Sequence, residues 1–301
     1  MTKLPDIFLI FYRLFLSNAT KKRFERIIVS LAIISFLLHL GLIAAAELGW
    51  LSSGQQQGKF LSNPIGAIYT PFSFILVYEV YLLVYYLPKS ISIYIGKQYE
   101  IITLIVIRRI FKDLANLDLS TNWFEAKYDL QFTYDIVATV VLFFLIFLFY
   151  KVNTTRIFPD YNPNIDSERE KDFFVQLKKI LSGILVPVFL GLAIYSFGNW
   201  LFNNMISVDQ MVGTVTDVNE VFFDDFFTIL ILTDVLLLLV SLFHTDQFRK
   251  VIRNSGFIIS TILIKLSFGA EGLLNIALIL SAVLFGLAIV WIHNKYEASN
   301  L

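Results

Sequence analysis

The stretch IITLIVIRRIF, residues 101–111, places two adjacent arginines, Arg108 and Arg109, in an otherwise apolar run. A charged side chain at the centre of a bilayer costs on the order of 2.5–3.5 kcal/mol or more. If this stretch crosses a membrane, the chain must compensate for these charges. The run therefore raises the question of which residues hold the two arginines there and what they do.

The composition of the chain supports a membrane location. The 301 residues are 57% hydrophobic and only 16% charged, whereas a soluble domain carries roughly 25% charged residues. The mean hydropathy of +0.70 agrees with this. Because a transmembrane helix needs about 20 apolar residues, we predict an all-α membrane protein with eight transmembrane helices. The apolar stretches are 26–48, 66–87, 98–117, 132–150, 180–202, 225–243, 254–269 and 273–292.

Basic residues are unevenly divided among the loops between these stretches. With eight spans, the loops on one side hold most of the lysines and arginines, whereas the loop 203–224 on the other side is acidic and has neither. The positive-inside rule then predicts that both termini are cytoplasmic. Near the N-terminus, the apolar run 7–16 is too short to span and is interrupted by Arg13. We expect an interfacial amphipathic segment there, not a signal peptide.

The pattern of the chain also predicts an internal repeat. IISTILIKLSF (258–268) aligns with IITLIVIRRIF, and TDVLLLLVSL (233–242) aligns with YEVYLLVYYL (78–87). Four apolar stretches match in the same order, which predicts two parallel four-helix repeats. The resulting division is an N-terminal interfacial segment 1–24, a first unit 25–151, a cytoplasmic polar connector 152–175 and a second unit 176–301.

The rare intramembrane charges coincide in this alignment. Glu79 aligns with Asp234, and Arg108 aligns with Lys265. Measured from the expected helix ends, Glu79 and Arg108 lie about 12 and 15 Å deep, at ~1.5 Å per residue. An acid and a base at similar depth on neighbouring antiparallel helices neutralise each other. We therefore predict two intramembrane ion pairs, Glu79–Arg108 and Asp234–Lys265, that join the second helix of each unit to the third.

The stretch LTDVLLLLVSLFHTDQFRKVIRNSGFIISTILIKLSFGAEGLLNIALILSAVLFGLAIVWIHNK (232–295) resembles the PsiE, or phosphate-starvation-inducible E, family of small four-span membrane proteins. The resemblance rests on Asp234, on Lys265 and on the tail from Trp291 to Lys295, and it extends to the first unit through Glu79 and Arg108. This chain differs by having two copies and by having Lys265 where the family has Arg. The resemblance implies a location in the bacterial cytoplasmic (inner) membrane and a stress-related role, with no reaction attached.

The first unit holds further polar residues without counterparts in the second. His39, Glu47, Arg109 and Lys112 align with uncharged residues there, and Tyr78 and Tyr81 fall on one face of the expected second helix. Surplus positive charge from Arg109 and Lys112 would attract an anion or reach the outer interface. A candidate polar pathway for ions or protons therefore consists of His39, Glu47, Arg109, Lys112, Tyr78 and Tyr81.

Several kinds of chemistry have no support in the sequence. There is no cysteine, and no P-loop, G-x-S-x-G or H-E-x-x-H motif occurs. We expect no enzymatic activity, cofactor, metal or nucleic acid. The expected partner is the lipid bilayer, with a homo-oligomer and small ions or protons as further candidates. The preferred function is a non-catalytic structural or sensory membrane protein, and the alternative is an ion or proton channel or transporter that uses the first unit.

Overall fold

The computed structural model describes residues 12, 14–49, 64–114, 127–154, 175–192, 195, 218–244 and 248–299. Throughout these residues the chain forms helices joined by short connections, without strands. The prediction of an all-α fold is therefore confirmed for this part of the chain. The elements are α2 (Asn18–Glu47), η2 (Pro64–Ile68), α3 (Tyr69–Tyr86), α4 (Ile91–Leu114), α5 (Lys127–Thr154), the helix Val175–Leu192, α7 (Val218–His244), α8 (Phe248–Phe268) and α9 (Gly272–Ala298).

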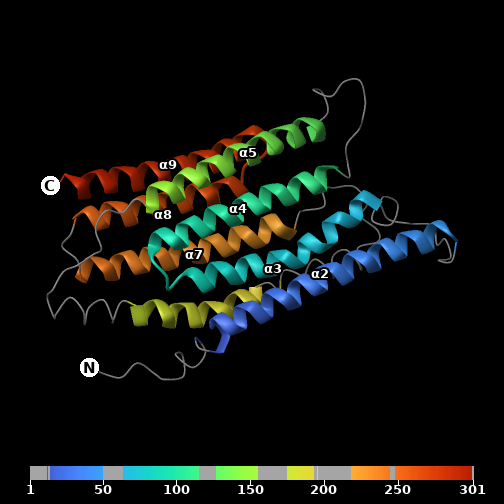
Figure 1. Ribbon diagram of the computed structural model, residues 1–301, viewed down its shortest axis with the longest axis horizontal. Coiled ribbons are helices and arrows are strands. Elements are labelled where there is room, and N and C mark those ends of the chain that lie inside the picture. The colour runs from blue at the N-terminus through green and yellow to red at the C-terminus, as the bar shows by residue number, and fades with distance from the viewer. Residues whose placement is uncertain are drawn as a thin grey trace.

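The helices run alongside one another in a single elongated bundle (Figure 1). Helix α4 packs against α3 and α5, its neighbours in sequence, and also against α8. Helix α5 packs on α9, and α8 packs on both α7 and α9. Helix α2 packs on α3 at one flank. The first half of the chain therefore meets the second half through α4 and α5.

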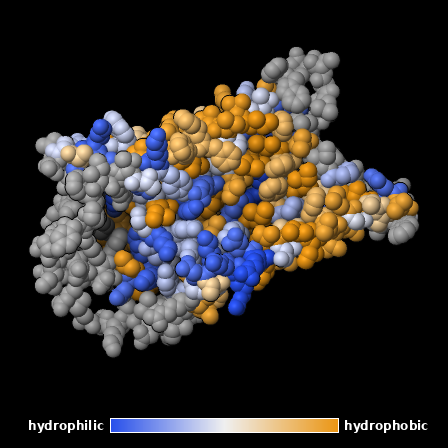
Figure 2. Space-filling view, in the orientation of Figure 1, coloured by the Kyte–Doolittle hydropathy of each residue, from blue (hydrophilic) through white to orange (hydrophobic). Residues whose placement is uncertain are grey.

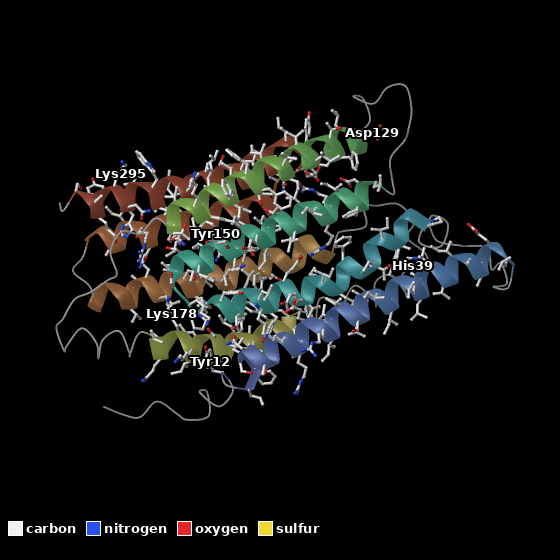
Figure 3. The ribbon with its side chains drawn as sticks, in the orientation of Figure 1. Tyr12, His39, Asp129, Tyr150, Lys178 and Lys295 are labelled. Atoms are coloured by element: carbon white, nitrogen blue, oxygen red, sulfur yellow. The ribbon has the colours of Figure 1, made fainter. Side chains whose placement is uncertain are left out.

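The two ends of the bundle are distinguished by the residues that lie there. Lys178 and Lys295 lie at one end, where α9 also finishes, and we call this the basic end (Figure 3). Asp129 and His39 lie toward the other end, which we call the opposite end (Figure 3). The helices alternate in direction between these two ends, as a multi-pass chain requires.

Local interactions account for where two of the helices begin. Ser17 caps α2, since its hydroxyl oxygen accepts a hydrogen bond from the backbone N–H of Thr20 at 3.1 Å. Such a cap satisfies one of the amide groups that a helix N-terminus leaves without a partner. Gly272 opens α9 with a φ of 61°, a left-handed conformation that costs glycine little. This turn sends α9 back along α8.

The helices extend beyond the apolar stretches that predicted them. Helix α2 begins at Asn18, α4 at Ile91 and α8 at Phe248, each earlier than hydropathy indicated. Hydropathy marks the lipid-embedded part of a helix, whereas backbone hydrogen bonding continues through polar turns at its ends. The predicted stretch 180–202 corresponds to the helix Val175–Leu192, and most of the remainder lies outside the described residues. The connector also lies largely outside them.

Within the described residues, five helices are long and apolar enough to cross a membrane. They are Asn18–Glu47, Asp129–Thr154, Val175–Leu192, Val251–Phe268 and Gly272–Ala298. On α2 and α5, large apolar side chains such as Leu38 and Val140 are more than 60% exposed. Apolar side chains cover much of the visible surface, and hydrophilic ones gather toward the basic end (Figure 2). Water would disfavour such a surface, and lipid would favour it.

Helix α4 carries both apolar and polar side chains that are buried. Its buried apolar side chains include Ile95, Ile102 and Val106. Buried polar side chains, among them Gln98 and Arg108, lie on the same helix. Because α3, α5 and α8 surround it, its polar groups meet protein instead of lipid, which is the arrangement that membrane helices with charges require.

Candidate functional site

The first buried charge pair joins α3 to α4. A terminal nitrogen of the Arg108 guanidinium donates a hydrogen bond to Oε2 of Glu79. Both side chains are only 2% exposed. A carboxylate and a guanidinium at such depth neutralise each other, whereas either one alone would leave a buried charge uncompensated. The contact predicted from the repeat is thus present in the first unit.

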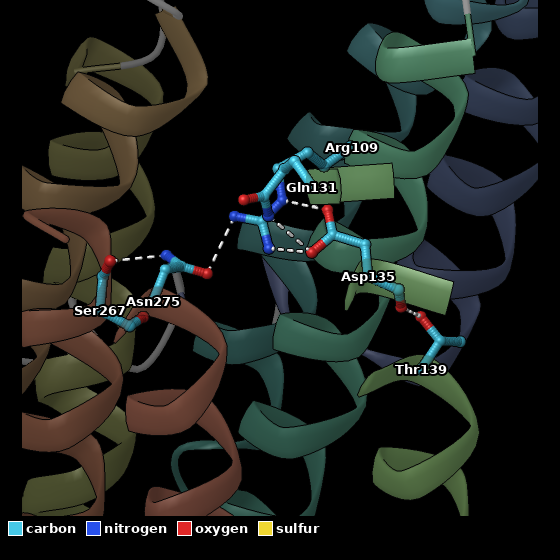
Figure 4. Close-up of polar contacts among 6 residues, drawn as sticks. All are labelled: Arg109, Gln131, Asp135, Thr139, Ser267 and Asn275. Atoms are coloured by element: carbon cyan, nitrogen blue, oxygen red, sulfur yellow. Dashed lines mark hydrogen bonds and ion pairs between the residues drawn. The ribbon is translucent and has the colours of Figure 1, made fainter. Parts of the chain in front are cut away.

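The second charge pair of α4 involves Arg109 and was not predicted. Its Nε and one terminal nitrogen donate to the two carboxylate oxygens of Asp135 on α5, at 2.5 and 2.7 Å (Figure 4). Asp135 is completely buried, and Arg109 is 23% exposed. This two-point geometry suits a planar guanidinium. The interpretation of Arg109 as surplus positive charge is therefore wrong, because Asp135 balances it.

The Arg109–Asp135 pair is part of a larger polar network (Figure 4). The other terminal nitrogen of Arg109 donates to Oδ1 of Asn275 on α9 at 2.9 Å. Asn275 in turn donates to the backbone carbonyl of Ser267, at the end of α8, at 2.6 Å. On α5, Gln131 donates a third hydrogen bond to Asp135 at 2.9 Å. We call these five residues the Arg109 network, and it links α4 and α5 to α8 and α9.

Nearer the basic end, α4 is joined to the second half by neutral hydrogen bonds. Thr261 on α8 donates to the amide oxygen of Gln98 at 2.8 Å. The hydroxyls of Tyr99 and Ser260 lie 2.7 Å apart, and Ser260 donates to the carbonyl of Ala282 on α9 at 2.7 Å. All of these side chains are buried. In a dry environment such contacts fix one register between α4 and α8.

A further acid in this region is Asp234 on α7, which is 7% exposed. Its charged neighbour is Lys178 of the helix Val175–Leu192, and its polar neighbours are Tyr94 and Gln98 of α4. The sequence predicted Lys265 as its partner, and that contact is not among these interactions. The Asp234–Lys265 pair therefore stays a prediction, and Lys178 is the neighbour that the sequence did not identify.

Other residues of the predicted polar pathway are spread along the bundle. Nδ1 of His39 lies 2.5 Å from the hydroxyl oxygen of Thr70, a contact between α2 and α3 near the opposite end. Glu47 is exposed in the last turn of α2. The side chain of Lys112 lies outside the described part of the structure. His39 and Glu47 therefore do not gather around Glu79 or Arg108.

The two tyrosines of the predicted pathway face α2 and the segment before it. Tyr81 donates its hydroxyl to the backbone carbonyl of Phe15 at 2.8 Å. The ring of Tyr81 lies 4.8 Å from that of Phe24, and the ring of Tyr78 lies 6.4 Å from it. These contacts join α3 to α2 and to the segment that precedes it.

Sequence reasoning missed the acid and the amide that complete the Arg109 network. Asp135 lies inside the predicted stretch 132–150, four residues after Gln131, and a carboxylate at that depth was itself a signal for a basic partner. Asn275 carries no charge and offered no comparable signal. The contact between Asn275 and Arg109 depends on how the two halves pack, which periodicity within one helix does not predict.

The chemistry of these groups is that of charge pairing and hydrogen bonding. Among the described residues, no group of three or more His, Asp or Glu side chains could hold a metal ion. The all-helical fold, the five apolar helices and the enclosed charges define an α-helical protein of membrane type. No protein-family model, no curated protein and no solved structure matches the chain.

Proposed function

We propose that this protein is a non-catalytic, multi-pass membrane protein with eight spans, whose role is structural or sensory and, by its resemblance to the PsiE family, stress-related. One observation carries the proposal. Both arginines of α4 form ion pairs with carboxylates from neighbouring helices. Arg108 pairs with Glu79, and Arg109 pairs with Asp135. Charges used in this way hold helices together and are not presented to a passing substrate.

The distribution of lysines and tyrosines supports a cytoplasmic position for the basic end. Nζ of Lys21 lies 5.1 Å from the ring centroids of both Tyr85 and Tyr86, and it donates to the hydroxyl of Tyr86 at 3.0 Å. Lys97 lies over the same Tyr86 ring at 5.4 Å. Amphipathic rings and lysines gathered at one level are typical of the cytoplasmic membrane interface.

The interior offers less support for the alternative of an ion or proton channel. Gln98 and Arg109 are separated by about three turns of α4. Between them lie buried apolar side chains, including Ile102 and Val106 on α4 and Ile264 on α8. The polar groups of this interval are engaged within the protein, since Thr103 donates to the carbonyl of Tyr99 and Arg108 pairs with Glu79. They therefore offer a passing ion little in return for its lost hydration.

Reporter fusions test the span count. A reporter placed in 203–224 is expected to read as external, and one placed in 155–174 as cytoplasmic, because eight spans put these loops on opposite sides. A cytoplasmic reading for both would contradict the eight-span arrangement. Fusions at the two termini serve as matched references, since both are expected to read as cytoplasmic.

Flux through reconstituted protein separates the structural role from the alternative. Full-length protein in liposomes is expected to give no ion or proton flux above that of empty liposomes across pH and voltage. The variants His39→Ala and Arg109→Ala are also expected to give no flux above that of empty liposomes. A flux that the full-length protein supports and either substitution abolishes would overturn the proposal and favour the channel.

A further inference from the structure

Asp234 differs from the other acids that interact with cations in the bundle. Asp135 receives three hydrogen bonds across its two oxygens, and Glu79 receives one from Arg108. In the described part of the structure, Oδ2 of Asp234 is buried and no hydrogen bond reaches it. Its carboxylate therefore keeps acceptor capacity deep inside a helical bundle.

Two other buried polar atoms near Asp234 share this property. The hydroxyl of Tyr94 and the amide nitrogen of Gln98 are fully buried, and neither forms a hydrogen bond of good geometry within the described residues. Both side chains nevertheless face Asp234 as weak hydrogen-bonding partners, and Tyr94 faces Gln98 in the same way. Three buried polar groups with incompletely satisfied hydrogen bonds thus face one another at the junction of α4 and α7. Such clusters are costly in a dry interior and are retained where a change of state is useful.

Positive charge approaches this cluster from the basic end. Lys178 is 8% exposed, and its Nζ donates to the backbone carbonyl of Lys89 in the turn between α3 and α4 at 3.3 Å. Arg253 on α8 interacts with Lys178 in turn. Lys265 lies in the last turn of the same helix, toward the opposite end. Of the charged side chains on these elements, Lys178 is the one that acts on Asp234 directly.

The composition of the cluster favours a proton over other ligands. A hard metal cation needs about six oxygen ligands, whereas the cluster supplies one carboxylate and one phenol, with the amide oxygen of Gln98 already accepting from Thr261. Lys178 would also repel a second cation. An anion would be repelled by Asp234. A proton needs only one carboxylate oxygen, and after binding that oxygen changes from acceptor to donor.

We propose that Asp234 is a reversible proton-binding site, held by Tyr94, Gln98 and Lys178 at the junction of α4, α7 and the helix Val175–Leu192. When the carboxylate binds a proton, its attraction to Lys178 is lost, and its O–H can donate to the hydroxyl of Tyr94. Protonation therefore alters the contacts between α7 and the other two helices. This site gives the bundle a means of responding to pH without moving an ion across the membrane.

Infrared difference spectroscopy on the full-length protein in liposomes tests the site. Between acidic and alkaline pH, a protonated-carboxyl band is expected to titrate in the native protein and to disappear in Asp234→Asn. Asp225→Asn is the matched control, because Asp225 is exposed on the same helix. The band is expected to persist in that variant. Persistence of the full band in Asp234→Asn would overturn the proposal.

A second variant keeps the test decisive if Asp234→Asn fails to fold. Lys178→Met retains the carboxyl and removes the neighbouring cation, so the pH midpoint of the band is expected to move upward by about one unit or more. Lys179→Met is the matched control, since Lys179 is the adjacent residue and interacts with the ring of Tyr12. Equal midpoints in the two variants would show that Lys178 does not act on the titrating group and would overturn the site as proposed.

Discussion

Replacing Gly286 with alanine tests the packing of α4 against the second half. A Cβ atom at Gly286 would lie 1.7 Å from the hydroxyl oxygen of Tyr99 and 2.8 Å from Cζ of the same ring. Tyr99 is completely buried and is held by Ser260, so its ring cannot swing into solvent. To admit one methyl group, α4 must shift away from α9 or the tyrosine must leave its hydrogen bond.

The structure sets the size of the expected loss. Overpacking a close contact costs roughly 1–3 kcal/mol, and leaving a buried hydroxyl without its partner costs about 1–3 kcal/mol more. Alanine has a higher helix propensity than glycine, which offsets about 1 kcal/mol of this loss of stability. Gly286→Ala is therefore expected to lower the free energy of unfolding by about 1–5 kcal/mol. Gly41→Ala on α2 is the matched control, because nothing lies within 4 Å of the added atom.

Equilibrium unfolding in mixed micelles, followed by circular dichroism, measures both variants. Tyr99→Phe removes the oxygen that the new methyl group meets and leaves Ser260 bonded to Ala282. In that background the cost of Gly286→Ala is expected to fall by at least about 1 kcal/mol. The reasoning is refuted if Gly286→Ala is as mild as Gly41→Ala, or if the Tyr99 and Gly286 changes are strictly additive.

Two further predictions concern the charge pairs of α4. Glu79→Gln alone is expected to cost roughly 3–5 kcal/mol, because Arg108 would keep a buried charge; adding Arg108→Gln is expected to recover much of this, and additive losses in the same unfolding assay would argue against the pairing. Arg109→Ala is expected to cost more than Asp135→Ala, because it leaves the completely buried Asp135 carboxylate without a cation, whereas Arg109 is partly exposed and can reach solvent when Asp135 is removed; the reverse order of midpoints would contradict this.

The fold class follows from features that the sequence displays directly. Apolar stretches of membrane length predicted helices that the structure contains, including α2 and α5, because lipid demands a backbone bonded within each segment. The ends of the helices were less predictable. Capping by Ser17 and polar turns at the starts of α4 and α8 extend helices beyond the part that hydropathy detects.

The site was predictable only where two charges were both visible and close along the chain. Glu79 and Arg108 lie on consecutive helices, so one antiparallel turn brings them near each other. Arg109 meets Asn275 across the two halves of the chain. Asp234 meets Lys178 within the second half, but on a helix that is distant in sequence. Such contacts depend on which helix faces are buried together, and that information is distributed over many weak interactions.

The position of Tyr99 and Gln98 has a consequence for biogenesis. During synthesis α4 leaves the ribosome well before α8 and α9, yet its hydrogen-bonding partners Ser260 and Thr261 lie on α8. Until α8 is inserted, the amide of Gln98 and the hydroxyl of Tyr99 cannot form their hydrogen bonds with Thr261 and Ser260. A chain cut short after α5 would therefore present the polar face of α4 to lipid.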